Sequence, residues 1–331
     1  MGEGTPVVHH SQRAPLRFVL IGAGAVGGYL GGRLIQSGQA VTFLVRPARK
    51  RQLDEDGLRI ESPLGNAHLM VKAVADPTAI GACDVIVVAV KSFDLDSVLA
   101  TIGWLGRDGA RVVSVLNGVE HLDKISEAVG RRSIVGAPLQ MEATLGQKGE
   151  IIHKSVAPRL ILGSLVGMPE DAEHVLEAFA AAGLKATLSS NLLLDFWRKN
   201  LFITVFSSAT TLARKPIGEV LADARTRQVA EEMAGELVRI ACLAEPQAGS
   251  ITEDEVMKRI RSMPPTMSSS MHHDLEKGLP LEVEGIQGYM VRKARKVGVK
   301  APALEASYAA LRLLNERPSR GKAAPTAVLD G

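Results

Sequence analysis

The stretch LRFVLIGAGAVG, residues 16–27, decides the fold of this chain. An apolar strand runs straight into a glycine-rich turn there. Gly22 permits the tight turn, Gly24 lets the backbone approach a pyrophosphate, and Gly27 allows the following helix to pack close to the strand. This order of elements predicts a dinucleotide-binding unit.

A helix is predicted after the turn because Val26, Leu30 and Leu34 form one apolar stripe. Gly38 is its expected C-terminal stop. The N–H groups of the first helical residues, Ala25 and Val26, are expected to face the phosphates. A chance glycine-rich turn is the alternative, but a strand, a turn, an amphipathic helix and a second strand in this order favour the dinucleotide site.

The second predicted strand, residues 40–45, ends at Arg46. Units that bind NAD usually carry an acidic residue at this point, which holds the ribose 2′-hydroxyl. An arginine suits a 2′-phosphate instead, so the sequence predicts NADP(H) as the cofactor. The basic residues that follow, Arg49, Lys50 and Arg51, could share that role or be ordinary solvated surface cations.

Composition excludes several classes of protein. The 331 residues carry 39 basic and 36 acidic side chains, a net charge of +3, and the charges are interspersed, so neither nucleic acid nor a membrane surface is an expected partner. Cys83 and Cys242 lie far apart, which indicates neither a disulfide framework nor a zinc site and fits a reducing cytoplasm. Residues 1–15 and 317–331 are expected to be flexible tails, the first without the apolar core of a signal peptide.

Two further apolar runs identify the edge of the sheet where a ligand would bind. Residues 84–90 form a β-branched run that ends at Lys91, and residues 111–116 form another that ends at Asn117. Ligands of open parallel sheets lie beyond the carboxyl ends of the strands. One crevice is therefore expected to be lined by Gly22, Arg46, Lys91 and Asn117.

Alternating strands and helices over residues 16–189 predict a Rossmann-type α/β domain with a mostly parallel sheet. Further strands that complete this sheet are expected within 134–142, 149–154 and 159–163. Helical periodicity prevails over 190–316, which predicts an all-helical second domain. Within it, the capping box at Thr252 starts one helix, and the last helical region is expected to begin near Leu281.

Two charged side chains in the helical domain are candidates for chemistry. Lys199 lies among apolar residues, so it either extends its ammonium to water or is a buried lysine of lowered pKa that acts as an acid. Glu282 taken alone is more often a surface carboxylate. The adjacent residues 272–274, His-His-Asp, do not face one way on a helix, so no metal site is predicted.

Over residues 17–315 the chain resembles the ketopantoate reductase (2-dehydropantoate 2-reductase) family. The glycine turn is the first of four motifs that carry the resemblance, in the same order and spacing. The others are Val90-Lys91 followed by Leu116-Asn117-Gly118, the helix with Trp197-Arg198-Lys199, and Ser269-Ser270-Met271 followed by Leu281-Glu282-Val283-Glu284-Gly285.

This resemblance implies an NADPH-dependent reductase of a 2-oxo acid, with ketopantoate as the leading substrate. It implies a helical domain like the C-terminal domain of 6-phosphogluconate dehydrogenase. The apolar stripes of the predicted helical domain are compatible with a homodimer. Lys199 would be the general acid and Glu282 would orient the substrate. Asn117 and Lys91 would lie beside the nicotinamide ribose, with Asn117 also next to the substrate, and Ser270 would contact the substrate.

The chain departs from the family pattern at two substrate positions. Members usually have asparagines four and eight residues after the catalytic lysine, where this chain has Ile203 and Ser207. Thr204 and Ser208 lie close to the same helix face and could compensate. The loss of amides makes a different 2-oxo acid the second hypothesis, and a non-catalytic NADP(H)-binding protein the third; retention of both Lys199 and Glu282 argues against the latter.

Overall fold

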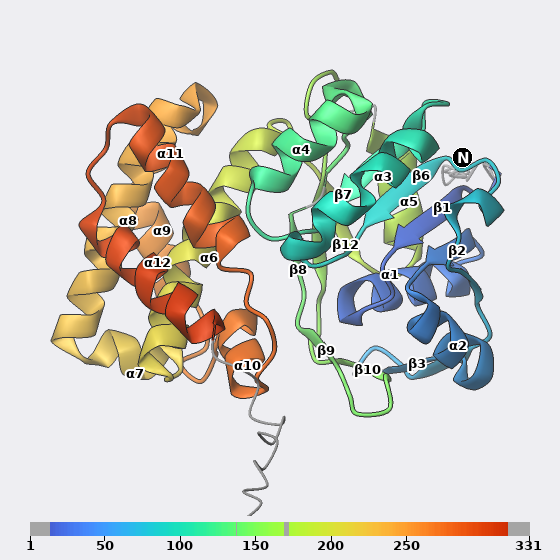
Figure 1. Cartoon of the computed structure of the whole chain (residues 1–331), viewed down its shortest axis with the longest axis horizontal. Coiled ribbons are helices and arrows are strands. Elements are labelled where there is room, and N and C mark those ends of the chain that lie inside the picture. Colours follow the sequence, from blue (N-terminus) through green and yellow to red (C-terminus); the bar gives the residue numbers. More distant parts are fainter. Residues whose placement is uncertain (1–13, 137, 169–171, 317–331) are drawn as a thin grey trace, which may run out of the picture.

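Five parallel strands form the main sheet of the N-terminal domain (Figure 1). In spatial order they are β5 (Lys72–Val74), β2 (Ala40–Leu44), β1 (Arg17–Ile21), β6 (Val85–Val88) and β7 (Arg111–Ser114). The last residues of β2, β1, β6 and β7 are in register, so the chain leaves these strands at one edge. The computed structural model describes residues 14–136, 138–168 and 172–316, and the two predicted tails therefore lie almost wholly outside it.

Helices cover both faces of this sheet, which explains why β6 is apolar at every position and fully buried. One face packs against α1 (Ala25–Gln36) and α5 (Glu173–Ala181), and the other against α3 (Leu99–Gly106) and α4 (Glu120–Val129). Helix α2 (Pro47–Asp56) follows β2, and the short 3₁₀ segments are η1 (Pro77–Ala79), η2 (Ser92–Val98) and η3 (Arg131–Ser133). The Rossmann-type arrangement is confirmed.

The later strands do not complete the main sheet, and that prediction is wrong. They form two small sheets instead, of which one is ordered β4 (Ala67–Leu69), β3 (Leu58–Glu61), β10 (Ile151–His153) and β9 (Ala143–Leu145). The other is ordered β12 (Lys185–Leu188), β11 (Arg159–Leu162) and β8 (Leu139–Gln140). Ile134 makes an isolated parallel bridge with Val112 of β7.

Helices make up the C-terminal domain, which lies to the left of the sheet domain in Figure 1. They are α6 (Leu192–Ala213), α7 (Ile217–Ala222), α8 (Ala224–Ala244), the 3₁₀ segment η5 (Pro246–Ala248), α9 (Glu253–Arg261), α10 (Ser270–Glu276), α11 (Tyr289–Val297) and α12 (Pro302–Asn315). The Thr252 hydroxyl caps α9 by accepting a hydrogen bond from the Glu255 N–H at 3.2 Å.

The last helical region begins later than predicted, with a π-helical turn (η6, Glu284–Gly288) that continues into α11. Leu281 and Glu282 precede it in an irregular segment. A single hydrophobic core runs from the α3/α4 face of the sheet through α6 into the helical domain, with Phe196 and Trp197 buried at the junction. None of the helices in the described ranges has the length and hydropathy needed to cross a membrane.

Candidate active site

The glycine turn after β1 leaves room for a phosphate group. Gly22 has φ of +100°, and a Cβ there would lie 2.9 Å from the Ala89 carbonyl oxygen. A Cβ on Gly27 would lie 2.1 Å from the Gly22 oxygen, so α1 packs closely on the turn. Among the described residues, no atom lies within 4 Å of the Cβ position of Gly24 and no side chain caps α1. The uncapped N–H groups at the start of α1 are thus open to an anion.

Arg46 lies at the tip of β2 with 76% of its side chain exposed. Its Nη2 is 2.6 Å from Oδ1 of Asp94, in the segment that follows β6. The guanidinium therefore connects the end of β2 with the segment after β6, at the edge where the four strands end. Lys50 pairs with Asp54 one turn further along α2, as a surface helix residue does.

Arg49 differs from its basic neighbours because it is partly buried beneath the glycine turn. Its Nε donates to the Ala23 carbonyl at 3.0 Å, and its Nη1 donates to the Gly149 carbonyl at 3.0 Å. Nη2 is buried and has no hydrogen-bond partner in the part of the chain that the structure describes, and burial lowers the pKa of this arginine. Arg49 thus joins the glycine turn to the β9–β10 hairpin, a role that sequence reasoning missed.

Lys91 and Glu282 come from different domains and meet beside the same edge. Lys91 Nζ lies 3.4 Å from Glu282 Oε2 and 2.8 Å from Asp274 Oδ2. Burial opposes the charge on Lys91, but the two carboxylates outweigh it and raise the pKa of its ammonium. The Ser92 N–H donates to Glu282 Oε1 at 2.8 Å, so this nearly buried carboxylate is held from both sides.

Asp274 was not predicted as a site residue. Its signal in the sequence is its position four residues after Ser270, which places both on one face of α10. The Ser269 hydroxyl caps α10, and Ser270 is exposed at its first position. The contact of Ser270 with substrate stays a prediction.

Lys199 is half-buried on α6, one turn beyond the buried Phe196. Its side chain makes no hydrogen bond or ion pair with any residue that the structure describes. Burial lowers the pKa of its ammonium to about 8, and the negative charge of Glu282 opposes that shift. A lysine in this environment has a proton to give at neutral pH, and no side chain in the described ranges already accepts it.

Asn117 is half-buried in the loop between β7 and α4. The next residue, Gly118, has φ of +86°, and a Cβ there would lie 2.7 Å from the carbonyl oxygen of Gly285 in the π turn. The loop that carries Asn117 therefore packs directly against the segment that follows Glu282. This contact joins the part of the candidate site that carries Asn117 to the part that carries Glu282.

The two positions that depart from the family pattern have different surroundings. Ile203 packs against the small apolar cluster around Met271 and Leu281. Ser207 is 1% exposed, and its hydroxyl accepts a hydrogen bond from Gln287 Nε2 at 2.9 Å. Gln287 also donates to Ser208 at 3.0 Å. Substrate contacts for Ile203 and Ser207 remain predictions.

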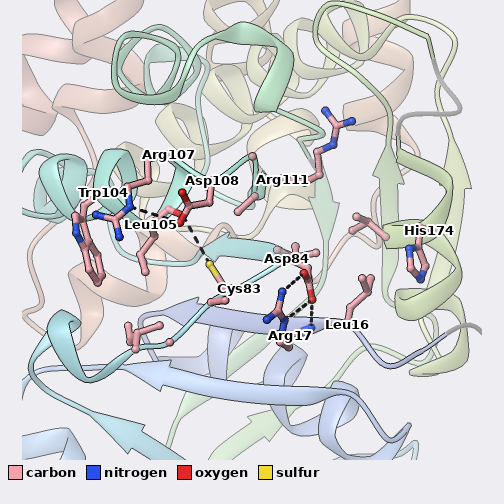
Figure 2. Close-up of a pocket in the computed structure, with 17 residues that line it drawn as sticks. Leu16, Arg17, Cys83, Asp84, Trp104, Leu105, Arg107, Asp108, Arg111 and His174 are labelled. Carbon is pink, nitrogen blue, oxygen red and sulfur yellow. Dashed lines mark hydrogen bonds and ion pairs between the residues drawn. The ribbon is translucent and has the colours of Figure 1, made fainter.

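A cavity of about 740 Å³ lies at the opposite edge, where the strands begin (Figure 2). Arg17 and Asp84 form an ion pair in it at 2.6 Å, and the Arg107 guanidinium lies over the Trp104 ring. The acidic groups in this cavity pair with basic neighbours, and we assign it no role. Within the described ranges no group of three His, Cys, Asp or Glu side chains could hold a metal ion.

Comparison with known proteins decides the family. The family model for ketopantoate reductase PanE/ApbA matches residues 18–167, and the model for the C-terminal domain of the same family matches residues 191–315. This chain belongs to the ketopantoate reductase family. Its family members are oxidoreductases that act on CH–OH groups, and the fold described above is that of the family.

Individual members of the family resemble the chain over nearly its whole length. It is 32% identical to the uncharacterised oxidoreductase YkpB of Bacillus subtilis (strain 168), over 90% of this chain and 98% of that protein. It is 27% identical to 2-dehydropantoate 2-reductase of Nostoc sp., over 92% and 97%. The crystal structure of 2-dehydropantoate 2-reductase from Geobacter metallireducens superposes with a TM-score of 0.81 at 26% identity, covering 90% of this chain and 99% of that one.

Proposed function

We propose that this chain reduces a 2-oxo acid to the 2-hydroxy acid with NADPH, with 2-dehydropantoate (ketopantoate) as the leading substrate and pantothenate biosynthesis as the pathway. The observation that carries the proposal is the placement of Lys199. This half-buried lysine pairs with none of the residues that the structure describes. Burial lowers the pKa of Lys199, the charge of Glu282 opposes that shift, and Glu282 contacts Lys91 at the edge of a dinucleotide-binding sheet. Family membership supports the same reaction class.

The residues at the edge of the sheet fit NADP(H). The open space over Gly24 and the uncapped start of α1 at Ala25 and Val26 suit a pyrophosphate. The exposed Arg46 guanidinium suits a 2′-phosphate, because arginine binds phosphate oxygens with two parallel hydrogen bonds. Lys91 and Asn117 follow the two strands on the other side of β1, where the nicotinamide end would lie.

Bound NADPH would supply the hydride that the carbonyl carbon of the substrate accepts. Negative charge then develops on the carbonyl oxygen, where the Lys199 ammonium can donate a hydrogen bond and then its proton. Hydride and proton together convert C=O to CH–OH and leave Lys199 as an amine, which regains a proton from water. General acid catalysis of this kind contributes roughly 10²–10⁴ in rate.

Glu282 has two roles in this proposal. Its charge raises the pKa of Lys199, which keeps the ammonium protonated near neutral pH. Its hydrogen bond from the Ser92 N–H fixes the carboxylate in one position, from which it can orient the substrate. Ser270 and Asn117 would supply further polar contacts to the substrate.

The apolar surroundings of Ile203 favour a second substrate hypothesis. An isoleucine offers no hydrogen bond to the hydroxyl of ketopantoate, whereas it can pack against an alkyl group. A 2-oxo acid with a branched or bulkier apolar side chain is therefore the alternative substrate. A homodimer and residence in the cytoplasm remain predictions from the sequence.

Steady-state oxidation of NADPH with a panel of 2-oxo acids tests the proposal. Ketopantoate or an apolar analogue should be turned over by the wild type and far more slowly by Lys199→Met. Turnover of no 2-oxo acid by a chain that binds NADPH would refute the proposal and favour a non-catalytic NADP(H)-binding protein.

A further inference from the structure

His121, in the first turn of α4, is a buried histidine that the mechanism above does not use. It is 3% exposed. Its Nδ1 lies 2.9 Å from the hydroxyl oxygen of Ser114, the last residue of β7. Its Nε2 lies 3.1 Å from the carbonyl oxygen of Gly118. The imidazole thus joins the end of β7 to Gly118, and Asn117 lies in the loop between these two contacts.

The partners of His121 determine which nitrogen carries the proton. The carbonyl oxygen of Gly118 can only accept, so Nε2 must be the N–H donor. Nδ1 is then free to accept the hydroxyl proton of Ser114. Burial lowers the pKa of His121 to about 3 despite the bond to Gly118, and the charge of Lys199 acts in the same direction. His121 is therefore neutral at the pH where the reaction would run.

The same imidazole contacts the helix that carries Lys199. The ring of Phe196 meets it edge to face, with centroids 5.4 Å apart and planes at 67°. Phe196 lies one turn before Lys199 on α6. One side chain therefore touches both segments of the candidate site, the loop of Asn117 and the helix of Lys199.

We propose that His121 is a positioning residue, whose neutral Nε2–H form holds the turn at Asn117 and Gly118 against the helix that carries Lys199. The proposal rests on the proposed function for its kinetic part. The groups in contact with the ring are the Ser114 hydroxyl from β7, the Gly118 carbonyl from the loop and the Phe196 ring from α6, and the charge of Lys199 on α6 also acts on it. A second positive charge on the imidazole would repel the Lys199 ammonium.

The tautomer can be observed without any substrate. Nitrogen-15 NMR of histidine-labelled protein should show one imidazole in the Nε2–H form, unchanged from about pH 8 to about pH 5, where an ordinary histidine titrates. Its signals should be absent from His121→Gln. A signal of His121 in the Nδ1–H form, or one that titrates near 6.5, would overturn the proposal whether or not the chain is a reductase.

Kinetics of three variants test the positioning role. His121→Phe keeps the ring and removes the bond to Gly118, and we expect kcat to fall about 10- to 100-fold, because small displacements of reacting groups cost that much. His121→Gln can still donate an N–H and should recover part of the loss, which also covers the case in which His121→Phe fails to fold. Ser114→Ala should lower kcat as well, since Nδ1 then loses the hydroxyl that helps to orient the ring.

His68→Gln is a matched control, because His68 Nε2 also bonds a backbone carbonyl, that of Asp56 at 2.7 Å, on the exposed surface. It should leave kcat unchanged. If His121→Phe lowers the melting temperature but its kcat at lower temperature equals that of the wild type, His121 is a packing residue and the proposal is wrong. If the wild type has no activity on 2-oxo acids, the proposed function fails, and the NMR result still decides the tautomer and the turn.

Discussion

Replacement of Lys199 by methionine should lower kcat by roughly 10²–10⁴ and make the chain more stable at neutral pH. Methionine has a similar length and no charge to desolvate. The pKa of Lys199 lies at about 8 in the native chain and at the ordinary value of 10.5 in the unfolded one. This difference between the two pKa values means that the charged lysine lowers the free energy of unfolding by at most about 3 kcal/mol.

The stability difference should depend on pH in a defined direction. Between about pH 8 and pH 10.5 the unfolded chain binds more protons at this lysine than the native chain, so native stability rises with pH. The full penalty is present below about pH 8. Lys199→Met should therefore exceed the wild type most at pH 7, and the excess should disappear as the pH approaches 10.5.

Urea unfolding of both proteins at several pH values measures this difference, with NADPH oxidation as the parallel assay. Lys215→Met is the control, because Lys215 is 57% exposed and pairs with Glu219 on the surface at 2.8 Å. Its free energy of unfolding should change by less than about 0.5 kcal/mol. Equal or lower stability of Lys199→Met at pH 7, or a difference that persists at pH 10.5, would show that the ammonium reaches water, and the general-acid role would lose its basis.

Three further predictions concern catalysis, the cofactor and the substrate. The wild-type kcat/KM should fall about tenfold per pH unit above about pH 8, where Lys199 loses its proton. In Glu282→Gln this fall should begin at a lower pH. A profile that stays flat up to about pH 10 would contradict the mechanism. Arg46→Ala should raise the KM for NADPH far more than that for NADH. Arg49→Met should raise the KM for NADPH and the KM for NADH alike, because Arg49 supports the glycine turn and not the 2′-phosphate. Equal effects of Arg46→Ala on the two KM values would refute the assignment of Arg46 to the 2′-phosphate. The ratio of kcat/KM for ketopantoate to that for 2-oxoisovalerate should be below about 10² and should rise in Ile203→Asn; a wild-type ratio of ~10⁴ would mean that other side chains recognise the hydroxyl.

Ser207 and Ile203 differ in burial, so they differ as positions for an asparagine substitution. Ser207 is fully buried against Gln287, so an asparagine there would overpack the core and cost roughly 1–3 kcal/mol. Ile203 is only partly buried and is the safer position for the single change.

Several features of this chain follow from sequence patterns alone. The turn at Gly22, the helix after it and the buried run in β6 depend on interactions within a few residues, namely steric limits on φ, helical periodicity and burial of β-branched side chains. Register then brings the ends of four parallel strands to one edge, so the common location of the residues that follow those strands could be predicted as well. The resemblance to the family added candidate roles for Lys199 and Glu282.

Other features required the tertiary structure. Which strands pair is decided by contacts distant in sequence, and for that reason the runs after residue 134 joined two small sheets and not the main one. The contact of Lys91 with Asp274 spans 183 residues, and no local pattern encodes it. His121 has no motif of its own. Its neutral state arises because folding buries it between a hydroxyl, a carbonyl and an aromatic ring, and burial of this kind exists only in the folded chain.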